Sequence, residues 1–303
     1  MFQNVIVGVD GREGGRDAIA LARALGPAGI TLVASYPAER TRWRGAVEGY
    51  FELLRKDADE LLEQTRRETG VEADVVACPD PSPARAIQRL AAERGADLIV
   101  IGSAHHGPVA RLLLGDVGRG VLHGAPCPVA VAPRGFAGSD GEIRRVGVGF
   151  DDSDEARAAL ALAAEIAGDR SGVLTVHSAW DVSPVLFTGV AYSPSLDDVL
   201  EAERAHATEA VDAALADLPR AGREIARGRA EEVLEAAAEN ADLLVVGSRG
   251  WGPARRIAVG STSDHLVHHA ACPVLVVPRP AEAGASAEDA HGDREPATAP
   301  AGD

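Results

Sequence analysis

A long internal repeat constrains this chain more than any other feature of its sequence. Residues 96–103 (ADLIVIGS) align with residues 241–248 (ADLLVVGS) at a shift of 145. The register continues to the end of each half, where residues 125–134 align with residues 270–279. A solenoid unit repeats every 20 to 50 residues or so, and this repeat is far longer. The sequence therefore predicts a duplicated domain.

The shift falls to 141 at the start of each half, where residues 7–10 (VGVD) match residues 148–151 (VGFD). The second half has therefore gained residues, most simply around 183–196. A chain of 303 residues is long enough for two domains that each bury a core. We predict a first domain at 1–134, a Gly- and Ser-rich linker at 135–143, a second domain at 144–279 and a disordered acidic tail at 280–303.

Short apolar runs alternate with longer amphipathic segments in both halves. Continuous Val, Ile and Leu runs separated by helices indicate parallel strands that are covered on both faces. Right-handed crossovers then give a doubly wound sheet in each half. The predicted fold class is α/β, with two tandem five-stranded parallel sheets. We expect strands near 4–9, 30–35, 71–77, 97–101, 128–132, 145–150, 172–178, 223–227, 242–246 and 273–277.

The composition limits the location and the partners. A hydrophobic content of 46% with 25% charged residues is typical of soluble proteins. A formal net charge of -16 argues against a general binder of nucleic acid or anionic membranes, because such proteins need a basic surface. The sequence has neither an apolar run that could cross a bilayer nor a leader, so we expect a cytoplasmic protein. Three cysteines without a paired arrangement indicate no disulfide framework.

A candidate phosphate-binding motif follows the apolar run at 241–246. Residues 247–250 (GSRG) are followed by nine residues and then by Gly260 and Ser261, where a helix is predicted to begin. Glycines allow a backbone to approach a ligand closely, and the N-terminus of a helix favours an anion. Ligands of doubly wound sheets lie at the carboxyl ends of the strands, where Asp151 and Gly247 fall.

Together, these features resemble the universal stress protein family in its tandem two-domain form. The resemblance covers about residues 1–279 and is carried by VGFD at 148–151, by the motif at 247–261 and by the closing Cys-Pro-Val strand of each half. It implies a Rossmann-like, adenine nucleotide alpha hydrolase-like fold and a regulatory protein that binds ATP, with Mg²⁺ carried by the phosphates. It also implies a pseudo-dimer joined through the final strands of the halves, allows a homodimer, and leaves the protein partner unknown.

The resemblance assigns roles to particular positions of the second half. Asp151 would contact the adenine or the ribose, Gly247, Arg249 and Gly250 would line the ribose and phosphates, and Gly260, Ser261 and Thr262 would hold the phosphates. The chemistry of these groups agrees, since a carboxylate accepts hydrogen bonds from hydroxyl or amino groups and a serine hydroxyl donates one.

The first half departs from the motif at two positions. His105 stands where Gly250 stands, and Asp116 replaces Ser261. A carboxylate about 4 Å from a phosphate costs several kcal/mol at protein-like dielectric, whereas Asp116 would be a good helix N-cap. We predict that the first half binds nucleotide weakly or not at all, with Asp10, Gly102 and Gly115 as its candidate contacts.

Other functions stay open at this point. An interaction module that has lost nucleotide binding is one alternative, and a slow ATPase or adenylyl-transferring enzyme is another. No catalytic residue is assigned, because no nucleophile and base can be paired from their spacing. No metal site is assigned either, since the run of His265, His268 and His269 lacks the further ligands that zinc needs.

Overall fold

The computed structural model describes residues 2–37, 48–103, 112–181, 196–248 and 260–278. The predicted tail at 280–303 and nearly all of the predicted insertion at 183–196 lie outside these residues. Among the helices described, none combines the length and the apolar character that a membrane crossing requires.

Strands and helices alternate through the first half as the repeat predicts. Its elements are β1 (Asn4–Gly8), α1 (Glu13–Ala24), β2 (Gly29–Tyr36), α2 (Glu48–Thr69), β3 (Asp74–Pro79), α3 (Pro83–Arg94), β4 (Leu98–Gly102), α4 (Asp116–Leu122) and β5 (Val129–Ala132). A short 3₁₀ helix, η1 (Phe136–Gly138), leads into the second half. There the order recurs as β6 (Arg145–Gly149), α5 (Asp154–Asp169), β7 (Val173–Trp180), α6 (Leu196–Ala214), β8 (Gly222–Arg227), α7 (Ala230–Ala238), β9 (Leu243–Gly247), α8 (Ser261–His269) and β10 (Val274–Val277).

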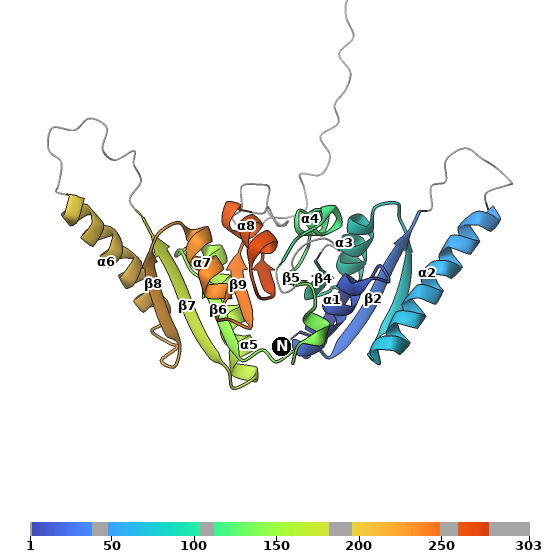
Figure 1. Ribbon diagram of the computed structural model, residues 1–303, viewed down its shortest axis with the longest axis horizontal. Helices are drawn as coiled ribbons and strands as arrows, with labels where there is room; N and C mark the ends of the chain where they lie inside the picture. Colours follow the sequence, from blue (N-terminus) through green and yellow to red (C-terminus); the bar gives the residue numbers. More distant parts are fainter. Residues whose placement is uncertain (1, 38–47, 104–111, 182–195, 249–259, 279–303) are drawn as a thin grey trace, which may run out of the picture.

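The ten strands of the described residues form one continuous sheet, in the order β3-β2-β1-β4-β5-β10-β9-β6-β7-β8. Every neighbouring pair is parallel except the central pair, where β10 runs antiparallel to β5 with Leu275 opposite Ala130. Figure 1 shows the two halves as wings on either side of these central strands, with α2 and α6 at the outer ends. The predicted α/β fold is confirmed, and so is the pseudo-dimer joined through the final strands.

Helices cover both faces of the sheet, which explains the continuous apolar strands. Successive strand residues point to opposite faces, so Val5 and Val7 enter one core while Ile6 enters the other. The first core is shared with helices α1, α2, α5 and α6, and the second with α3, α4, α7 and α8. Because each core draws on both halves, the two domains pack as one unit.

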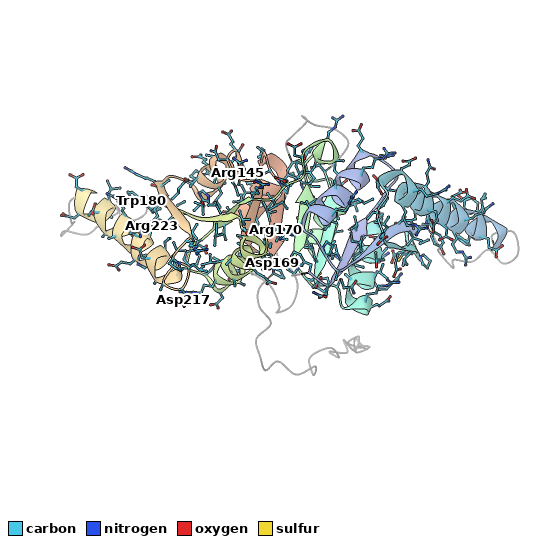
Figure 2. All side chains as sticks on the ribbon, turned by 90° about the horizontal axis from the view of Figure 1, so that it is seen from below. Arg145, Asp169, Arg170, Trp180, Asp217 and Arg223 are labelled. Carbon is cyan, nitrogen blue, oxygen red and sulfur yellow. The ribbon has the colours of Figure 1, made fainter. Side chains whose placement is uncertain are left out.

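Side-chain hydrogen bonds also connect the two halves outside the sheet. Arg170, just after α5, donates hydrogen bonds to the carbonyl oxygens of Ala24, at 3.2 Å, and Leu25, at the end of α1. It therefore satisfies acceptors that the end of a helix leaves without partners, and it lies where the two halves meet (Figure 2). Residues of the predicted linker are held as well, because the buried carboxylate of Asp17 accepts bonds from the backbone N–H groups of Gly135, at 2.9 Å, and Ala137, at 2.8 Å.

Candidate functional site

The structure brings four of the predicted second-half residues to one cavity. Asp151 follows β6, Gly247 ends β9, and Gly260 and Thr262 lie at the start of α8; all four line a cavity of about 150 Å³. Ser261 is the first residue of α8 and is exposed. The other two predicted contacts, Arg249 and Gly250, lie outside the described residues.

The carboxylate of Asp151 is positioned by the turn that starts α5. Its Oδ1 accepts hydrogen bonds from the hydroxyl of Ser153, at 2.5 Å, and from the backbone N–H of the same residue, at 3.2 Å. Asp152 has a φ of 63°, which lets the chain reverse here. Ser153 then caps the helix by accepting a bond from the N–H of Ala156 at 3.2 Å. These contacts hold an acceptor at the edge of the cavity.

Helix α8 begins where the sequence predicts. Gly260 is its N-cap, with an extended backbone (φ −73°, ψ 163°), and its carbonyl oxygen accepts the N–H of Asp264 at 2.8 Å. The first N–H groups of a helix have no acceptors within the helix, and its dipole places partial positive charge there. The hydroxyls of Ser261 and Thr262 stand at this end, which gives the site donors suited to an anion.

The two glycines at the ends of β4 and β9 have a packing reason that the sequence does not reveal. A Cβ on Gly102 would lie 2.0 Å from the carbonyl oxygen of Gly14 in α1. A Cβ on Gly247 would lie 2.8 Å from the backbone carbon of Glu155 in α5. In each half, therefore, the first turn of a helix sits against the end of the strand, and this contact requires a glycine whether or not a ligand is bound.

Sequence reasoning missed His177, which lines the second-half cavity from β7. It pairs with Gly149 in the sheet, as Val33 pairs with Gly8 in the first half, so the histidine replaces a valine. The residue is 7% exposed, and its Nδ1 lies 3.2 Å from Oε2 of Glu224. Burial lowers the pKa of His177, and the nearby carboxylate opposes that shift. Aligning the second strand of each half would have exposed this exchange.

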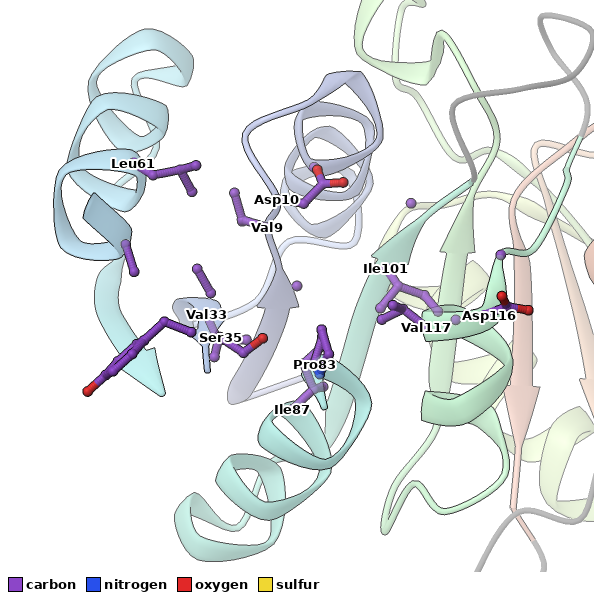
Figure 3. A pocket seen from close by; sticks show the side chains of 18 of the residues that line it. Val9, Asp10, Val33, Ser35, Leu61, Pro83, Ile87, Ile101, Asp116 and Val117 are labelled. Carbon is purple, nitrogen blue, oxygen red and sulfur yellow. The ribbon is translucent and has the colours of Figure 1, made fainter. Parts of the chain in front are cut away.

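The first half contains a larger cavity, of about 630 Å³ (Figure 3). The candidates Asp10, Gly102 and Gly115 line it together with Asp116, so the structure brings these predicted positions together. Gly115, with ψ 176°, is the N-cap of α4, and Asp116 is the first helical residue. The prediction that Asp116 is the cap was wrong, because the extended residue that precedes the helix is the glycine. His105 lies outside the described residues.

A second replacement in the first half was also missed. Val117 occupies the position of Thr262, directly after Asp116, and it lines the cavity with 44% of its surface exposed. Both hydroxyls at the start of α8 are therefore absent from the start of α4. The signal was available in the sequence, where GDV at 115–117 aligns with GST at 260–262.

The histidines of α8 are engaged in contacts within the protein. Nε2 of His265 lies 2.8 Å from Oε2 of Glu235, and the ring stacks on His269 with centroids 4.2 Å apart. Nδ1 of His268 lies 2.6 Å from the carbonyl oxygen of Asp264. In the part of the chain that the structure describes, no three His, Cys, Asp or Glu side chains are grouped to hold a metal ion.

Comparison with known proteins identifies relatives of both halves. The model of the universal stress protein family matches residues 1–133 and again residues 142–278. The chain is 33% identical over 183 residues to universal stress protein Rv2005c of Mycobacterium tuberculosis, a match that covers 60% of this chain and 61% of that relative's length. It is 28% identical over 295 residues to universal stress protein Rv2623 of the same organism, covering 90% of this chain and 95% of the relative.

A solved structure shows the same fold across the whole duplicated unit. The crystal structure of a universal stress protein from Archaeoglobus fulgidus superposes with a TM-score of 0.66 at 22% identity, covering 91% of this chain and 98% of that one. The family model, in turn, matches each half of the duplicated fold separately. The chain therefore belongs to the universal stress protein family, in its tandem two-domain form.

Proposed function

We propose that this chain is a regulatory protein of the cytoplasm that binds ATP in its second half. Its binding of a protein partner would depend on whether that site holds ATP. The proposal rests on two supports, the chain's membership of the universal stress protein family and the geometry of the cavity beside Asp151. The observation that carries it is that Asp151, Gly260 and Thr262 line one cavity at the carboxyl ends of β6 and β9. That edge is where doubly wound sheets bind nucleotides.

Each end of the cavity suits a different part of an adenine nucleotide. The carboxylate of Asp151 can accept hydrogen bonds from a ribose hydroxyl or an adenine amino group. The start of α8 supplies N–H groups and the hydroxyls of Ser261 and Thr262 for phosphate oxygens, with Mg²⁺ shared among the phosphates. We propose that Gly247, Arg249 and Gly250 complete the ribose and phosphate contacts.

The second-half site is connected to the first half, which supports a regulatory role. The carbonyl oxygen of Ala270, just after α8, accepts a hydrogen bond from the N–H of Leu112 at 2.9 Å. Nε2 of His268 lies 3.4 Å from Nη2 of Arg119 in α4. Helices α4 and α8 lie close together beside the central strands (Figure 1). A ligand that shifts α8 would therefore act on contacts that cross between the halves, and partner binding could respond to the nucleotide.

The direct test compares two substitutions that add the same charge. Ser261→Asp places in the second half the residue that Asp116 supplies in the first, whereas Ser171→Asp adds a carboxylate at an exposed turn before β7. Nucleotide released from natively purified protein would be identified by mass spectrometry, and stability would be measured with and without ATP. ATP at 100 times its dissociation constant should add about 2.7 kcal/mol to the free energy of unfolding.

We expect the parent chain and the Ser171→Asp variant to gain this stabilisation and the Ser261→Asp variant to lose most of it. Equal retention of nucleotide by the two variants would remove the start of α8 from the site. No ATP effect on the parent chain would contradict the proposed function itself.

A further inference from the structure

The first-half cavity has the size and the lining of a small-molecule site. Its volume of about 630 Å³ lies within the range of roughly 300 to 1,000 Å³ that such sites occupy. Apolar side chains from separate elements face it: Leu61 from α2, Ile87 from α3 and Ile101 from β4 (Figure 3). Open apolar space of this kind loses packing contacts, so it favours an occupant with a flat or apolar body.

The charges around this cavity disfavour an anion. Asp10, Asp57 and Asp116 all line it, and all three are exposed at its rim. Among the described residues that line the cavity, none is a lysine, an arginine or a histidine. A phosphorylated ligand would bring further negative charge to three carboxylates with no cation from this set to offset it.

The two hydroxyl donors of the second half are also replaced at the edge of this cavity. The second half has Ser261 and Thr262 at the start of a nine-residue helix, whereas the first half has Asp116 and Val117 at the start of a seven-residue helix. The side chain of Val117 cannot form a hydrogen bond, and the ionised carboxylate of Asp116 can only accept hydrogen bonds. This replacement is a separate observation from the cavity's size. Like the acidic rim, it disfavours a phosphorylated ligand.

The polar groups that remain suit a ligand with its own hydrogen-bond donors. The carboxylate of Asp10, fixed by a bond from the N–H of Arg12 at 3.1 Å, stands at one side of the cavity. The hydroxyl of Ser35 at the end of β2 stands at another (Figure 3). A sugar hydroxyl or an exocyclic amino group can donate a hydrogen bond to such oxygens without adding charge.

We propose that the first-half cavity binds an uncharged nucleoside and rejects its phosphorylated forms, so that the two halves of one chain distinguish ligands by phosphorylation. The choice of a nucleoside rests on the proposed function of the second half. The selection against phosphate rests on the cavity itself. The ligand's ring lies among Leu61, Ile87 and Ile101, and its ribose lies toward Asp10.

Photolabelling of the full chain tests this proposal half by half. The probes are 2-azidoadenosine and 2-azido-ATP, and the labelled peptides are located by mass spectrometry. We expect 2-azidoadenosine to label the first half, with unlabelled adenosine as an effective competitor. AMP and ATP should compete at that half at least roughly tenfold less well than adenosine. The ATP probe should label the second half.

A double variant reverses both causes of selectivity together. Asp116→Ser combined with Val117→Thr restores the second-half residues at exposed positions and should raise the affinity of the first half for AMP by roughly tenfold or more. Because both side chains line the cavity, the measured quantity is the ratio of AMP competition to adenosine competition at the first half, compared with the parent chain. Ser171→Asp serves as the control, and circular dichroism checks that each variant is folded.

Several results would overturn the proposal. These are no first-half labelling by the adenosine probe, equal competition by adenosine and ATP at the first half, and no gain in AMP affinity for the double variant. A failure of the proposed function would look different, because the ATP probe would then fail to label the second half while adenosine labelling of the first half remained.

Discussion

Replacing Gly102 with alanine tests whether the glycine at the end of β4 serves packing or only ligand approach. The new Cβ would lie 2.0 Å from the carbonyl oxygen of Gly14 and 2.7 Å from its Cα. Ordinary carbon–oxygen contacts begin at about 3.3 Å, so the backbone of α1 would have to retreat by about 1.3 Å. A backbone oxygen cannot rotate away as the end of a side chain can, so the strain falls on a helix that packs against β1 and β4.

The expected loss is at the upper end of what overpacking costs, about 3 kcal/mol of unfolding free energy. This corresponds to a drop of roughly 6 to 12 °C in the unfolding midpoint. Gly247→Ala should cost less, since its nearest contact, with Glu155, is 2.8 Å. Gly168→Ala is the matched control, because nothing lies within 4 Å of its Cβ and it sits within α5. We expect that control to stabilise the chain by about 0.5 to 1 kcal/mol.

Thermal unfolding of the ligand-free chain, followed by far-ultraviolet circular dichroism, measures all three variants. Nucleotide must be removed first, so that any loss reflects packing alone. If Gly102→Ala unfolded at the same temperature as Gly168→Ala, the packing reason for the glycine would be refuted. Ligand approach would then be the remaining explanation for the glycine.

Two further predictions concern buried titratable groups. Because burial lowers the pKa of His177 below its ordinary 6.5, the unfolded chain binds this proton more readily. The contribution of His177 to stability is therefore complete above pH 6.5 and is lost as the pH falls toward the folded-state pKa. His177→Val, which copies Val33, should reduce the loss of stability between about pH 7.5 and pH 5 in urea unfolding; an unchanged loss would contradict this. Burial also raises the pKa of the thiols of Cys127 and Cys272 to about 12, so iodoacetamide should modify them far more slowly in the folded chain than in denaturant, as measured by mass spectrometry.

The sheet was predictable because its strands are apolar on both faces and the pattern occurs twice. Val5, Ile6 and Val7 are all buried, though they point to alternate faces, and only a doubly covered strand allows this. Pairing of the two halves was expected only from the family resemblance. The sequence of β5 (Val129–Ala132) and β10 (Val274–Val277) shows two short apolar strands that would otherwise be exposed edges, but it does not say that they meet.

The candidate site was predictable in its outline and not in its detail. Asp151, Gly260 and Thr262 fall at one cavity because the carboxyl ends of parallel strands share one edge of the sheet. The packing of Gly102 against α1 depends on how closely the helix crosses the strand, and a sequence pattern does not encode that distance. Val117 and His177 were visible as differences between the two copies, but only the structure shows that each of them lines a cavity.

The two copies differ in ways that are hard to reconcile with the simple decay of one site. A copy that had only lost nucleotide binding would have no reason to keep a cavity, because filling about 630 Å³ with larger side chains would gain packing. The first half instead keeps an apolar wall and Asp10, and it changes the two residues that would meet phosphate, Asp116 and Val117. The shared sheet constrains the first half, because β5 of the first half pairs with β10 of the second half. Under the proposed selectivity, the first cleft takes a different ligand while the strands of its half still complete the second half's sheet.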